Sequence, residues 1–360
     1  MRDVAVIGVG MNRWGELWTQ SLRDIWTEAA LEAVDDAGVD RVDALYVGCM
    51  SGGLFVGQEH LGALLADQLG MGPIPGTRVE SACASGGLAL RQAWMDVASG
   101  LHDVVLATGV EKMTDVDGGA ATDALATAAD QEYESYHGVT FPGLYGMMAH
   151  AHMHQHRTTR RQLSAVAVKN HRHGTLNPLA QYPTEVTAEQ VEESVLVADP
   201  LRILDCSPIT DGAAAVVLVP LDEARSWPNH APVRIAASAH ATASIARPER
   251  EDLAWLASTE RAAGLAYAHA GITCDDLSFC EVHDCFTIAE VMVIEALGIA
   301  PRGCGGSGAE SGATALGGKV PVNPSGGLKS KGHPVGATGI AQVREAVLQL
   351  RGEAGERQVK

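Results

Sequence analysis

The 360-residue sequence has few aromatic residues and few lysines, and no two of its cysteines have CxxC spacing. Aromatic residues make up 4% of the chain, whereas 40 glycines predict tight turns and close helix packing. Seven cysteines without a CxxC motif argue against a disulfide framework and a structural zinc site. No apolar run is long enough to span a membrane, and the first residues resemble a strand rather than a signal peptide. We therefore expect a soluble, cytoplasmic protein.

The charges are predominantly negative, with a formal net charge of −18, which disfavours nucleic acid or an anionic membrane as a partner. Only six of the 26 basic residues are lysines. Residues 157–173 depart from this background because they contain basic residues and no acidic one. These basic residues are Arg157, Arg160, Arg161, Lys169 and Arg172. The stretch is either a solvated helix face or an anchor for an anionic ligand.

The order of hydrophobic patterns predicts an α/β fold of two or three subdomains. In the first half we expect strands at 4–9, 44–48 and 103–109, and helices at 22–37, 60–69 and 88–98. In the second half we expect strands at 233–239 and 278–281, an extended segment at 320–322, and helices at 252–270, 287–297 and 337–350. An irregular insertion separates the halves, and a small-residue strand at 211–218 is expected to close the first sheet. This repeated order predicts two similar halves with the functional site between them.

Cys83 lies where a short β-prone run gives way to a helix pattern. The unpaired N–H groups at the start of a helix stabilise a thiolate, and they can also hold the oxygen of a tetrahedral intermediate. The small neighbours Ala82, Ala84 and Ser85 leave room for a ligand backbone. A buried, inert thiol is the alternative, and the spacing alone does not decide between them.

Two further segments have the composition of site loops. His283 and Cys285 are two residues apart at the exit of an expected strand, so they point to the same side. They form either a proton donor–acceptor pair or a packed strand end. His333 lies between Gly332 and Pro334 and could take a proton from Cys83 or serve as a turn or helix cap.

Three other motifs lack residues that their usual chemistry requires. The sequence Gly8-Val9-Gly10 lacks the third glycine of a dinucleotide-binding turn, because Arg13 occupies that position. The glycine-rich region near Lys319 lacks the Lys-Ser/Thr ending of a P-loop. The histidines between 150 and 156 would face different sides of a helix without adjacent carboxylates, so we expect no metal there.

Taken together, these segments resemble the thiolase superfamily, in particular the archaeal and sterol-carrier-type thiolases. The matching motifs are Cys83-Ala84-Ser85, Asp211-Gly212-Ala213-Ala214-Ala215, His283-Asp284-Cys285-Phe286 and Gly332-His333-Pro334. The resemblance covers essentially the whole chain and implies a five-layer α/β/α/β/α fold. It implies an N-terminal half at 1–110 closed by a strand near 211–220, a loop domain at 111–210 for substrate recognition, and a C-terminal half at 221–360. The printed sequence stops at Lys360, where other thiolases continue through a last strand and a glycine-rich loop. We therefore expect this half to lack both.

The resemblance also implies acyl transfer and Claisen condensation or cleavage on coenzyme A (CoA) thioesters, with acetyl-CoA and acetoacetyl-CoA as the expected substrates and no other cofactor. In this family pattern Cys83 is the acyl-accepting nucleophile and His333 the base that activates it. His283 stands where an oxyanion-hole asparagine is found in other thiolases, and Cys285 transfers the proton at the substrate α-carbon. The CoA-binding residues expected are Ser207, Lys331, Arg160 and Arg161.

The same resemblance implies a homodimer or tetramer, and either a small OB-fold partner protein or a hydroxymethylglutaryl-CoA synthase as a partner. Two other functions remain possible. A retro-aldolase of this fold, acting on steroid side-chain CoA thioesters, would need no nucleophilic cysteine, which disfavours it because Cys83 is present. A non-catalytic acyl-CoA- or lipid-binding scaffold would bind the thioester without a covalent intermediate.

Overall fold

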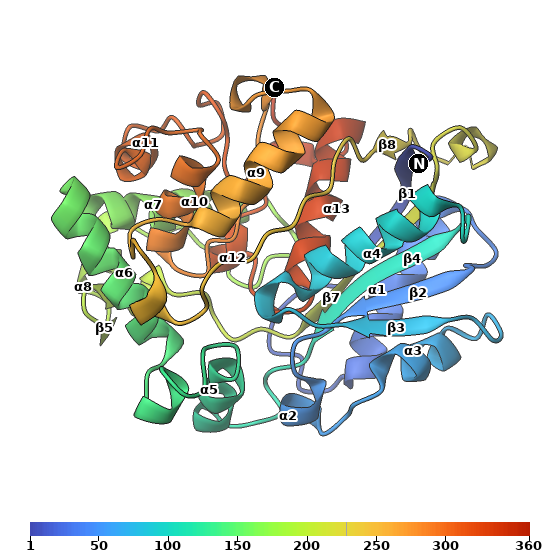
Figure 1. The fold of residues 1–360 in the computed structure, drawn as a ribbon, viewed down its shortest axis with the longest axis horizontal. Helices are drawn as coiled ribbons and strands as arrows, with labels where there is room; N and C mark the ends of the chain where they lie inside the picture. Colours follow the sequence, from blue (N-terminus) through green and yellow to red (C-terminus); the bar gives the residue numbers. More distant parts are fainter. Residues whose placement is uncertain (228) are drawn as a thin grey trace. The chain divides into compact units, whose positions relative to one another are not determined.

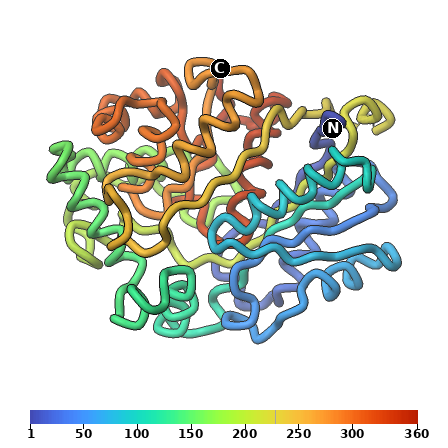
Figure 2. The backbone as a smooth tube through the Cα atoms, in the orientation of Figure 1, coloured from blue at the N-terminus to red at the C-terminus, as the bar shows by residue number. Residues whose placement is uncertain are grey.

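The computed structural model describes residues 1–227 and 229–360, which form two compact units (Figure 1). Unit 1 comprises Met1–Asp117, Ile209–Ser238 and His333–Gly355, and unit 2 comprises Gly118–Pro208, Ala239–Gly332 and Glu356–Lys360. The chain therefore passes repeatedly from one unit to the other, as the tube coloured by residue number shows (Figure 2). This division differs from the expected three parts, because the last helix of the predicted C-terminal half belongs to unit 1.

Unit 1 is built on a six-stranded sheet in the order β3-β2-β4-β7-β1-β8. The strands are β1 Val4–Met11, β2 Ala44–Gly48, β3 Gly76–Val79, β4 Val105–Glu111, β7 Gly212–Pro220 and β8 Val233–Arg234. Strand β2 pairs in parallel with β3 and β4, whereas β7 pairs antiparallel with β4 and β1. The small-residue strand predicted at 211–218 thus joins the sheet of the first half, as expected.

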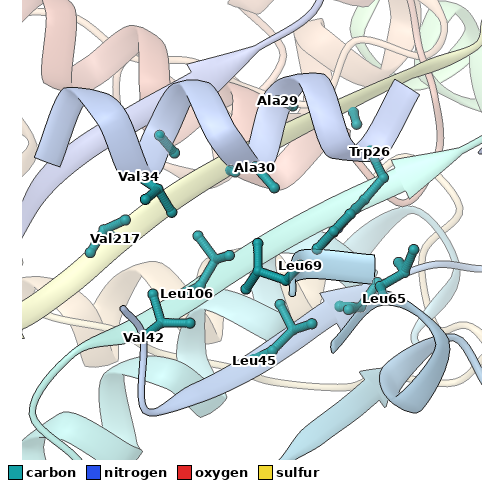
Figure 3. Packing of buried hydrophobic residues seen from close by; sticks show 14 of the residues in the cluster. Trp26, Ala29, Ala30, Val34, Val42, Leu45, Leu65, Leu69, Leu106 and Val217 are labelled. Carbon is teal, nitrogen blue, oxygen red and sulfur yellow. The ribbon is translucent and has the colours of Figure 1, made fainter. Parts of the chain in front are cut away.

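Helices cover both faces of this sheet. They are α1 Leu22–Ala37, α3 Leu61–Leu69, α4 Ser85–Ser99 and α13 Thr338–Arg351, while the short helix α2 Gly52–Val56 lies in the connection between β2 and α3. On β4, Leu106 and Val110 lie in the apolar cluster that α1 and α3 cover, part of which Figure 3 shows. Gly109 points to the opposite face, where an added Cβ would contact the backbone at Ala337, beside the start of α13. The two-residue period of the strand therefore separates two helix layers.

The glycines of β1 allow α1 to lie unusually close to the sheet. An added Cβ on Gly8 would overlap the carbonyl oxygen of Ala33, and one on Gly10 would overlap that of Ala29. The Gly8-Val9-Gly10 pattern is therefore a packing feature, which agrees with the rejection of a dinucleotide-binding turn. The helix begins with a capping box from Ser21 and ends at Gly38, which has a left-handed backbone.

Unit 2 consists mainly of helices packed around a second apolar cluster. The helices are α5 Gly118–Ala126, α6 Phe141–His156, α7 Arg160–Gly174, α8 Ala188–Glu193, α9 Ala257–Ala270, α10 Thr287–Ala296, α11 Gly305–Glu310 and α12 Gly327–Ser330. A hairpin of β5 Leu196–Ala198 and β6 Leu201–Arg202 completes the unit. Met148, Leu163, Ile288 and Leu328 are buried in the cluster together with Cys285 and Phe286, so the apolar centre adjoins the 283–286 loop.

Two of the strands expected in the second half are corrected by the structure. The strand at 233–239 is reduced to β8, which pairs with β1 in unit 1. The strand at 278–281 is not formed, since within the described ranges this region has only an isolated pairing of Cys280 with Val322. Pro321 offers no N–H for a ladder, and the N–H of Val282 donates instead to the Asn323 side chain.

No helix in the described ranges is both long and apolar enough to cross a membrane.

Candidate active site

Cys83 lies in unit 1 on a tight turn between β3 and α4. The turn is the short 3₁₀ segment Ala82–Ala84, and Ala82 has a left-handed backbone with φ of 46°. Ser85 secures it, because its buried hydroxyl accepts from the Ser81 N–H at 2.9 Å and donates to the Ala82 carbonyl at 2.6 Å. The thiol of Cys83 is free and half-buried. The expected strand-to-helix junction is therefore present, with the sulfur near the first turn of α4.

His333 lies in the same unit, and one of its ring nitrogens is within 4.8 Å of the Cys83 sulfur. Its backbone N–H donates to Thr210 Oγ1 at 2.9 Å. Nδ1 lies 2.7 Å from Thr338 Oγ1, and that hydroxyl donates its own hydrogen to the Pro334 carbonyl. Nδ1 must therefore carry the proton and donate it to Thr338, which leaves Nε2 as the basic nitrogen.

The buried carboxylate of Glu111, at the end of β4, fastens the segment that carries His333. It accepts from the Gly336 N–H at 3.0 Å and from the N–H groups of Met50 and Ser51 at 2.8 and 3.1 Å. The thiol of Cys49 donates to the same carboxylate. Burial raises the pKa of Glu111, while the four donors oppose that shift. The ends of β2 and β4 are thus joined to the residues following His333.

Close glycine contacts surround this clamp and leave no room for side chains. An added Cβ on Gly86 would lie 2.5 Å from the Gly336 carbonyl oxygen, and one on Gly48 would lie 2.6 Å from the Gly86 backbone. The first turn of α4 is therefore packed directly on the His333 segment. These contacts hold the backbones that carry Cys83 and His333 in one rigid arrangement within unit 1.

Unit 2 contributes His283 and Cys285. Burial raises the pKa of the Cys285 thiol, but the charge of His283, hydrogen bonds from His283 and Tyr145, and the charge of Lys329 outweigh it. The net pKa of Cys285 is therefore lowered. Tyr145 also stacks on Phe286, with ring centroids 4.5 Å apart. The structure thus brings the predicted His–Cys pair together and adds a tyrosine to it.

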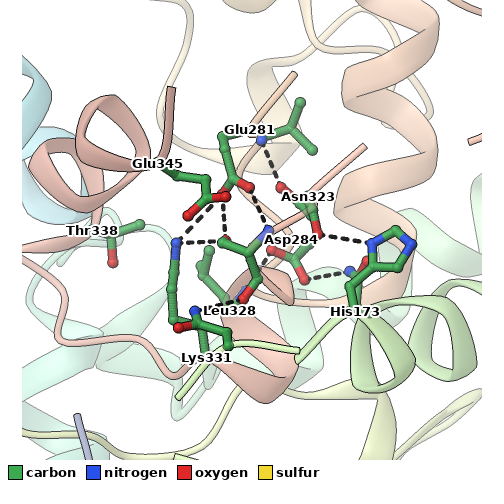
Figure 4. Close-up of polar contacts among 12 residues, drawn as sticks. His173, Glu281, Asp284, Asn323, Leu328, Lys331, Thr338 and Glu345 are labelled. Atoms are coloured by element: carbon green, nitrogen blue, oxygen red, sulfur yellow. Dashed lines mark hydrogen bonds and ion pairs between the residues drawn. The ribbon is translucent and has the colours of Figure 1, made fainter. Parts of the chain in front are cut away.

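The loop that carries His283 is anchored on both sides of that residue (Figure 4). The Val282 N–H donates to Asn323 Oδ1 at 2.8 Å, and Asp284 accepts from the Leu328 N–H at 2.7 Å. Asp284 also accepts from Asn170. All of these anchors except Val282 and Leu328 are buried polar side chains, so the loop depends on a hydrogen-bonded network rather than on a strand ladder.

The buried imidazole of His173 supports this network in its neutral form. Nδ1 lies 2.9 Å from the Asn323 carbonyl oxygen, and Nε2 accepts from the Leu316 N–H at 3.0 Å. Burial, and then the charge of Lys169, lower the pKa of His173 to about 3. Protonation of Nε2 would remove the acceptor for Leu316, so the neutral ring is part of the folded arrangement.

The predicted CoA-binding residues have different surroundings in unit 2. Ser207 is half-buried, and its N–H donates to the Cys285 carbonyl. Lys331 is buried and its ammonium group bonds Ser325 and Glu281, so its observed partners are internal. Arg161 is exposed and pairs with Glu189.

Arg160 differs from these because part of its guanidinium group has no hydrogen-bond partner. Its Nη2 bonds Asp205 and Ser164, whereas the buried Nε and Nη1 have none among the described residues. The predicted histidine tract on α6 has internal contacts, since His152 bonds Thr158 and Glu295.

The sequence-based reasoning missed Glu111, Thr338, Tyr145 and the unpaired buried amine of Lys329. Thr338 had a local signal, because it follows His333 by five residues at the start of a predicted helix. Glu111 and Tyr145 had none, since their partners are distant in the sequence.

Family comparisons agree with this geometry. Residues 4–222 match the model of the thiolase N-terminal domain, and residues 237–360 match that of the thiolase C-terminal domain. The chain belongs to the thiolase family. An acetyl-CoA acetyltransferase of Methanothermobacter thermautotrophicus is 57% identical over 362 residues, covering 100% of this thiolase and 94% of the relative. Human sterol carrier protein 2 is 35% identical over 376 residues, covering 100% of this chain and 68% of that protein.

The fold of this thiolase also matches solved structures. The structure of an Ltp2-ChsH2(DUF35) aldolase superimposes with a TM-score of 0.85 at 26% sequence identity. The superposition covers 98% of this thiolase and 91% of that chain. The predicted thiolase fold is therefore confirmed, although the second sheet is represented in the described ranges only by isolated pairings.

Replacing Glu111 by Gln should destabilise unit 1 by about 2–4 kcal/mol. The amide NH₂ of Gln would face backbone N–H groups that now donate to a carboxylate oxygen. Denaturant unfolding measures the loss, with the exposed Glu16→Gln as the matched control. Equal unfolding midpoints for the two variants would contradict the clamp.

His173 should make the protein lose stability in mild acid. Its pKa of about 3 in the folded protein lies below the value of about 6.5 in the unfolded chain, so the unfolded chain takes up the proton first. This stabilisation is complete above about pH 6.5 and falls by about 2 kcal/mol at pH 5. Urea unfolding above pH 6.5 and at pH 5 should show a smaller loss of unfolding free energy for His173→Gln than for the wild type. Its control, His154→Gln at an exposed position, should keep the full loss.

Proposed function

We propose that this thiolase transfers acyl groups between CoA thioesters, with Cys83 as the acyl-accepting nucleophile and 2 acetyl-CoA to acetoacetyl-CoA plus CoA as its reaction, in either direction. The observation that supports this most directly is that the Cys83 thiol, on the turn before α4, lies near the His333 imidazole. Nδ1 of that imidazole hydrogen-bonds Thr338, so Nε2 is the basic nitrogen. A relative named acetyl-CoA acetyltransferase at 57% identity supports the choice of the acetyl group.

In the first half-reaction His333 Nε2 takes the proton of the Cys83 thiol. The thiolate attacks the thioester carbonyl carbon, and N–H groups at the start of α4 stabilise the oxyanion of the tetrahedral intermediate. The bond between the carbonyl carbon and the CoA sulfur then breaks. CoA leaves as a thiol after receiving the proton from His333, and the acyl group remains on Cys83.

In the second half-reaction Cys285 removes a proton from the α-carbon of a second acetyl-CoA, while His283 stabilises the enolate oxygen. The lowered pKa of Cys285 supports this assignment, because a base must be deprotonated near neutral pH. The enolate carbon attacks the acyl carbonyl and displaces the Cys83 sulfur.

The proposed CoA contacts are Ser207 at the pantetheine arm and Arg160 at a phosphate. The unpaired Nε and Nη1 of Arg160 support its assignment, since they can donate to phosphate oxygens. Arg161 and Lys331 would have to exchange their carboxylate partners, Glu189 and Glu281, to bind a phosphate. No other cofactor is required by the proposed chemistry.

We extend the proposal to a cytoplasmic homodimer or tetramer that works with a small OB-fold partner or a hydroxymethylglutaryl-CoA synthase. The structural neighbour, whose name joins Ltp2 to ChsH2(DUF35), supports a protein partner. Because that neighbour is named an aldolase, it also favours a retro-aldolase as the second candidate, with steroid side-chain CoA thioesters as the expected substrates. A non-catalytic scaffold is a third outcome of the experiment below.

Acetyl-CoA should label Cys83 covalently. Mass spectrometry of the peptide containing Cys83 should detect the acetyl group, and Cys83→Ala should abolish the label and lower activity by about 10³-fold or more. Cys304→Ala, at an exposed cysteine, is the matched control and should retain both. Full aldol cleavage without a label would favour the retro-aldolase, and acyl-CoA binding without turnover would favour the scaffold.

Replacement of Cys285 by Ala should separate the two half-reactions. Acetylation of Cys83 should continue, whereas condensation should fall by about 10²–10⁴-fold because the α-carbon loses its base. Single-turnover labelling and steady-state condensation measure the two steps. Cys206→Ala is the nearby control, since burial raises the pKa of this thiol to about 11. Equal losses in both half-reactions would rule out proton transfer by Cys285.

A further inference from the structure

Four of the six lysines are buried, and three of these have a carboxylate partner. The three pairs are Lys112 with Asp211, Lys169 with Glu290, and Lys331 with Glu281. Lys329 is the exception. It is 2% exposed, and its Nζ has no hydrogen-bond partner among the described residues. An ammonium group removed from water without a compensating charge is strongly unfavourable, so this amine requires an explanation.

Lys329 lies on α12 and reaches toward the 283–286 loop of the same unit. Its Nζ is 5.8 Å from the centroid of the Phe286 ring, next in sequence to Cys285. A cation near an aromatic ring gains some energy, but less than a full negative charge provides. Phe286, Cys285 and Leu328 belong to one apolar cluster, so charges interact strongly there.

Neither Asp284 nor Asp205 hydrogen-bonds the Lys329 ammonium, and both carboxylates have other partners. Asp284 is bonded to Leu328 and Asn170, and Asp205 to Arg160 and Thr287. On α7, burial and then the charge of Lys329 lower the pKa of His171, which keeps that ring neutral.

The surroundings of Cys206 and Cys285 shift the pKa of these two thiols in opposite directions. Burial raises the pKa of Cys206 to about 11, so this thiol stays protonated although Lys329 opposes the shift. Tyr145 on α6 and His283 both hydrogen-bond Cys285. Cys285 is therefore the group at which donors and positive charge converge.

We propose that Lys329 supplies the fixed positive charge that holds Cys285 as a thiolate, the form that can take a proton from the α-carbon of an acyl-CoA. This inference rests on the proposed function. In the step, the C–H bond breaks and its electron pair forms the enolate, while the thiolate sulfur gains the proton and becomes a thiol. The return of that proton reverses the step. Lys329 acts through Cys285 without touching the substrate, so it is a positioning residue.

Hydrogen exchange of the acetyl-CoA methyl group in D₂O, followed by NMR as a function of pH, isolates this proton transfer from condensation. Lys329→Met removes the charge at similar length, Lys329→Gln is a polar neutral variant, and Lys329→Arg keeps the charge. We expect the lower limb of the pH profile to move up by at least about one unit in the two neutral variants, with exchange at pH 7 slowed about tenfold. Lys329→Arg should restore the wild-type profile, and the exposed Lys319→Met should leave it unchanged.

Two further measurements separate this role from a structural one. Acetylation of Cys83 should stay within about twofold in Lys329→Met, because the first half-reaction does not use Cys285. The melting temperature of Lys329→Met should equal or exceed that of the wild type, since an unpaired buried charge is removed. Lys331→Met, two residues away, should lower it by leaving Glu281 unpaired.

A pH profile of exchange that is unchanged in folded Lys329→Met or Lys329→Gln would overturn the proposal. So would a thiolate absorbance of Cys285, measured in Cys83→Ser protein, that titrates at or above the ordinary range of about 8.5. This second measurement does not depend on the folding of any Lys329 variant. Wild-type protein that neither exchanges the methyl hydrogens nor acetylates Cys83 would instead overturn the proposed function.

Discussion

The buried carboxylate of Glu111 makes the hydrogen bonds on which the candidate site of unit 1 depends. It joins the end of β2, the end of β4 and the segment after His333 through three backbone N–H groups. Gly48, Gly86 and Gly336 let the first turn of α4 approach the same segment without intervening side chains. Cys83 and His333 thus come from a turn and a loop far apart in the sequence. Glu111 fastens the segment after His333, and α4, which begins just after Cys83, packs on that same segment. Removing that charge would release several main-chain donors at once.

In unit 2, hydrogen bonds between side chains, rather than a sheet, fix the loop that carries the candidate site residues. The loop that carries His283 and Cys285 is hydrogen-bonded by Asn323 and, through its own Asp284, by Asn170. His173 in turn hydrogen-bonds the carbonyl oxygen of Asn323. Such a network is rigid only while every member is paired, because each unmet polar group is costly in an apolar setting. The two units therefore hold their candidate site residues by different physical means, unit 1 through close backbone packing and unit 2 through buried hydrogen bonds.

Local patterns in the sequence predicted the helices and most strands of unit 1, because α1 and β7 carry their own signals in capping residues and small apolar runs. They also predicted Cys83, His283, Cys285 and His333 as candidates. The strand expected at 278–281 failed because its register depended on partners that a proline and an asparagine side chain replace. Contacts such as Thr338 to His333 or Tyr145 to Cys285 could not be predicted, since they arise only when distant segments fold together.

The scarcity and burial of lysine have a consequence for a protein that works among activated thioesters. Unprotonated primary amines attack thioesters directly, whereas guanidinium groups stay protonated and do not. Four of the six lysines are enclosed, which leaves the ammonium groups of Lys319 and Lys360 on the surface. The protein therefore offers acyl donors very few accidental acceptors, so uncontrolled chemical modification by its own proposed substrates is restricted to a handful of sites remote in sequence from Cys83.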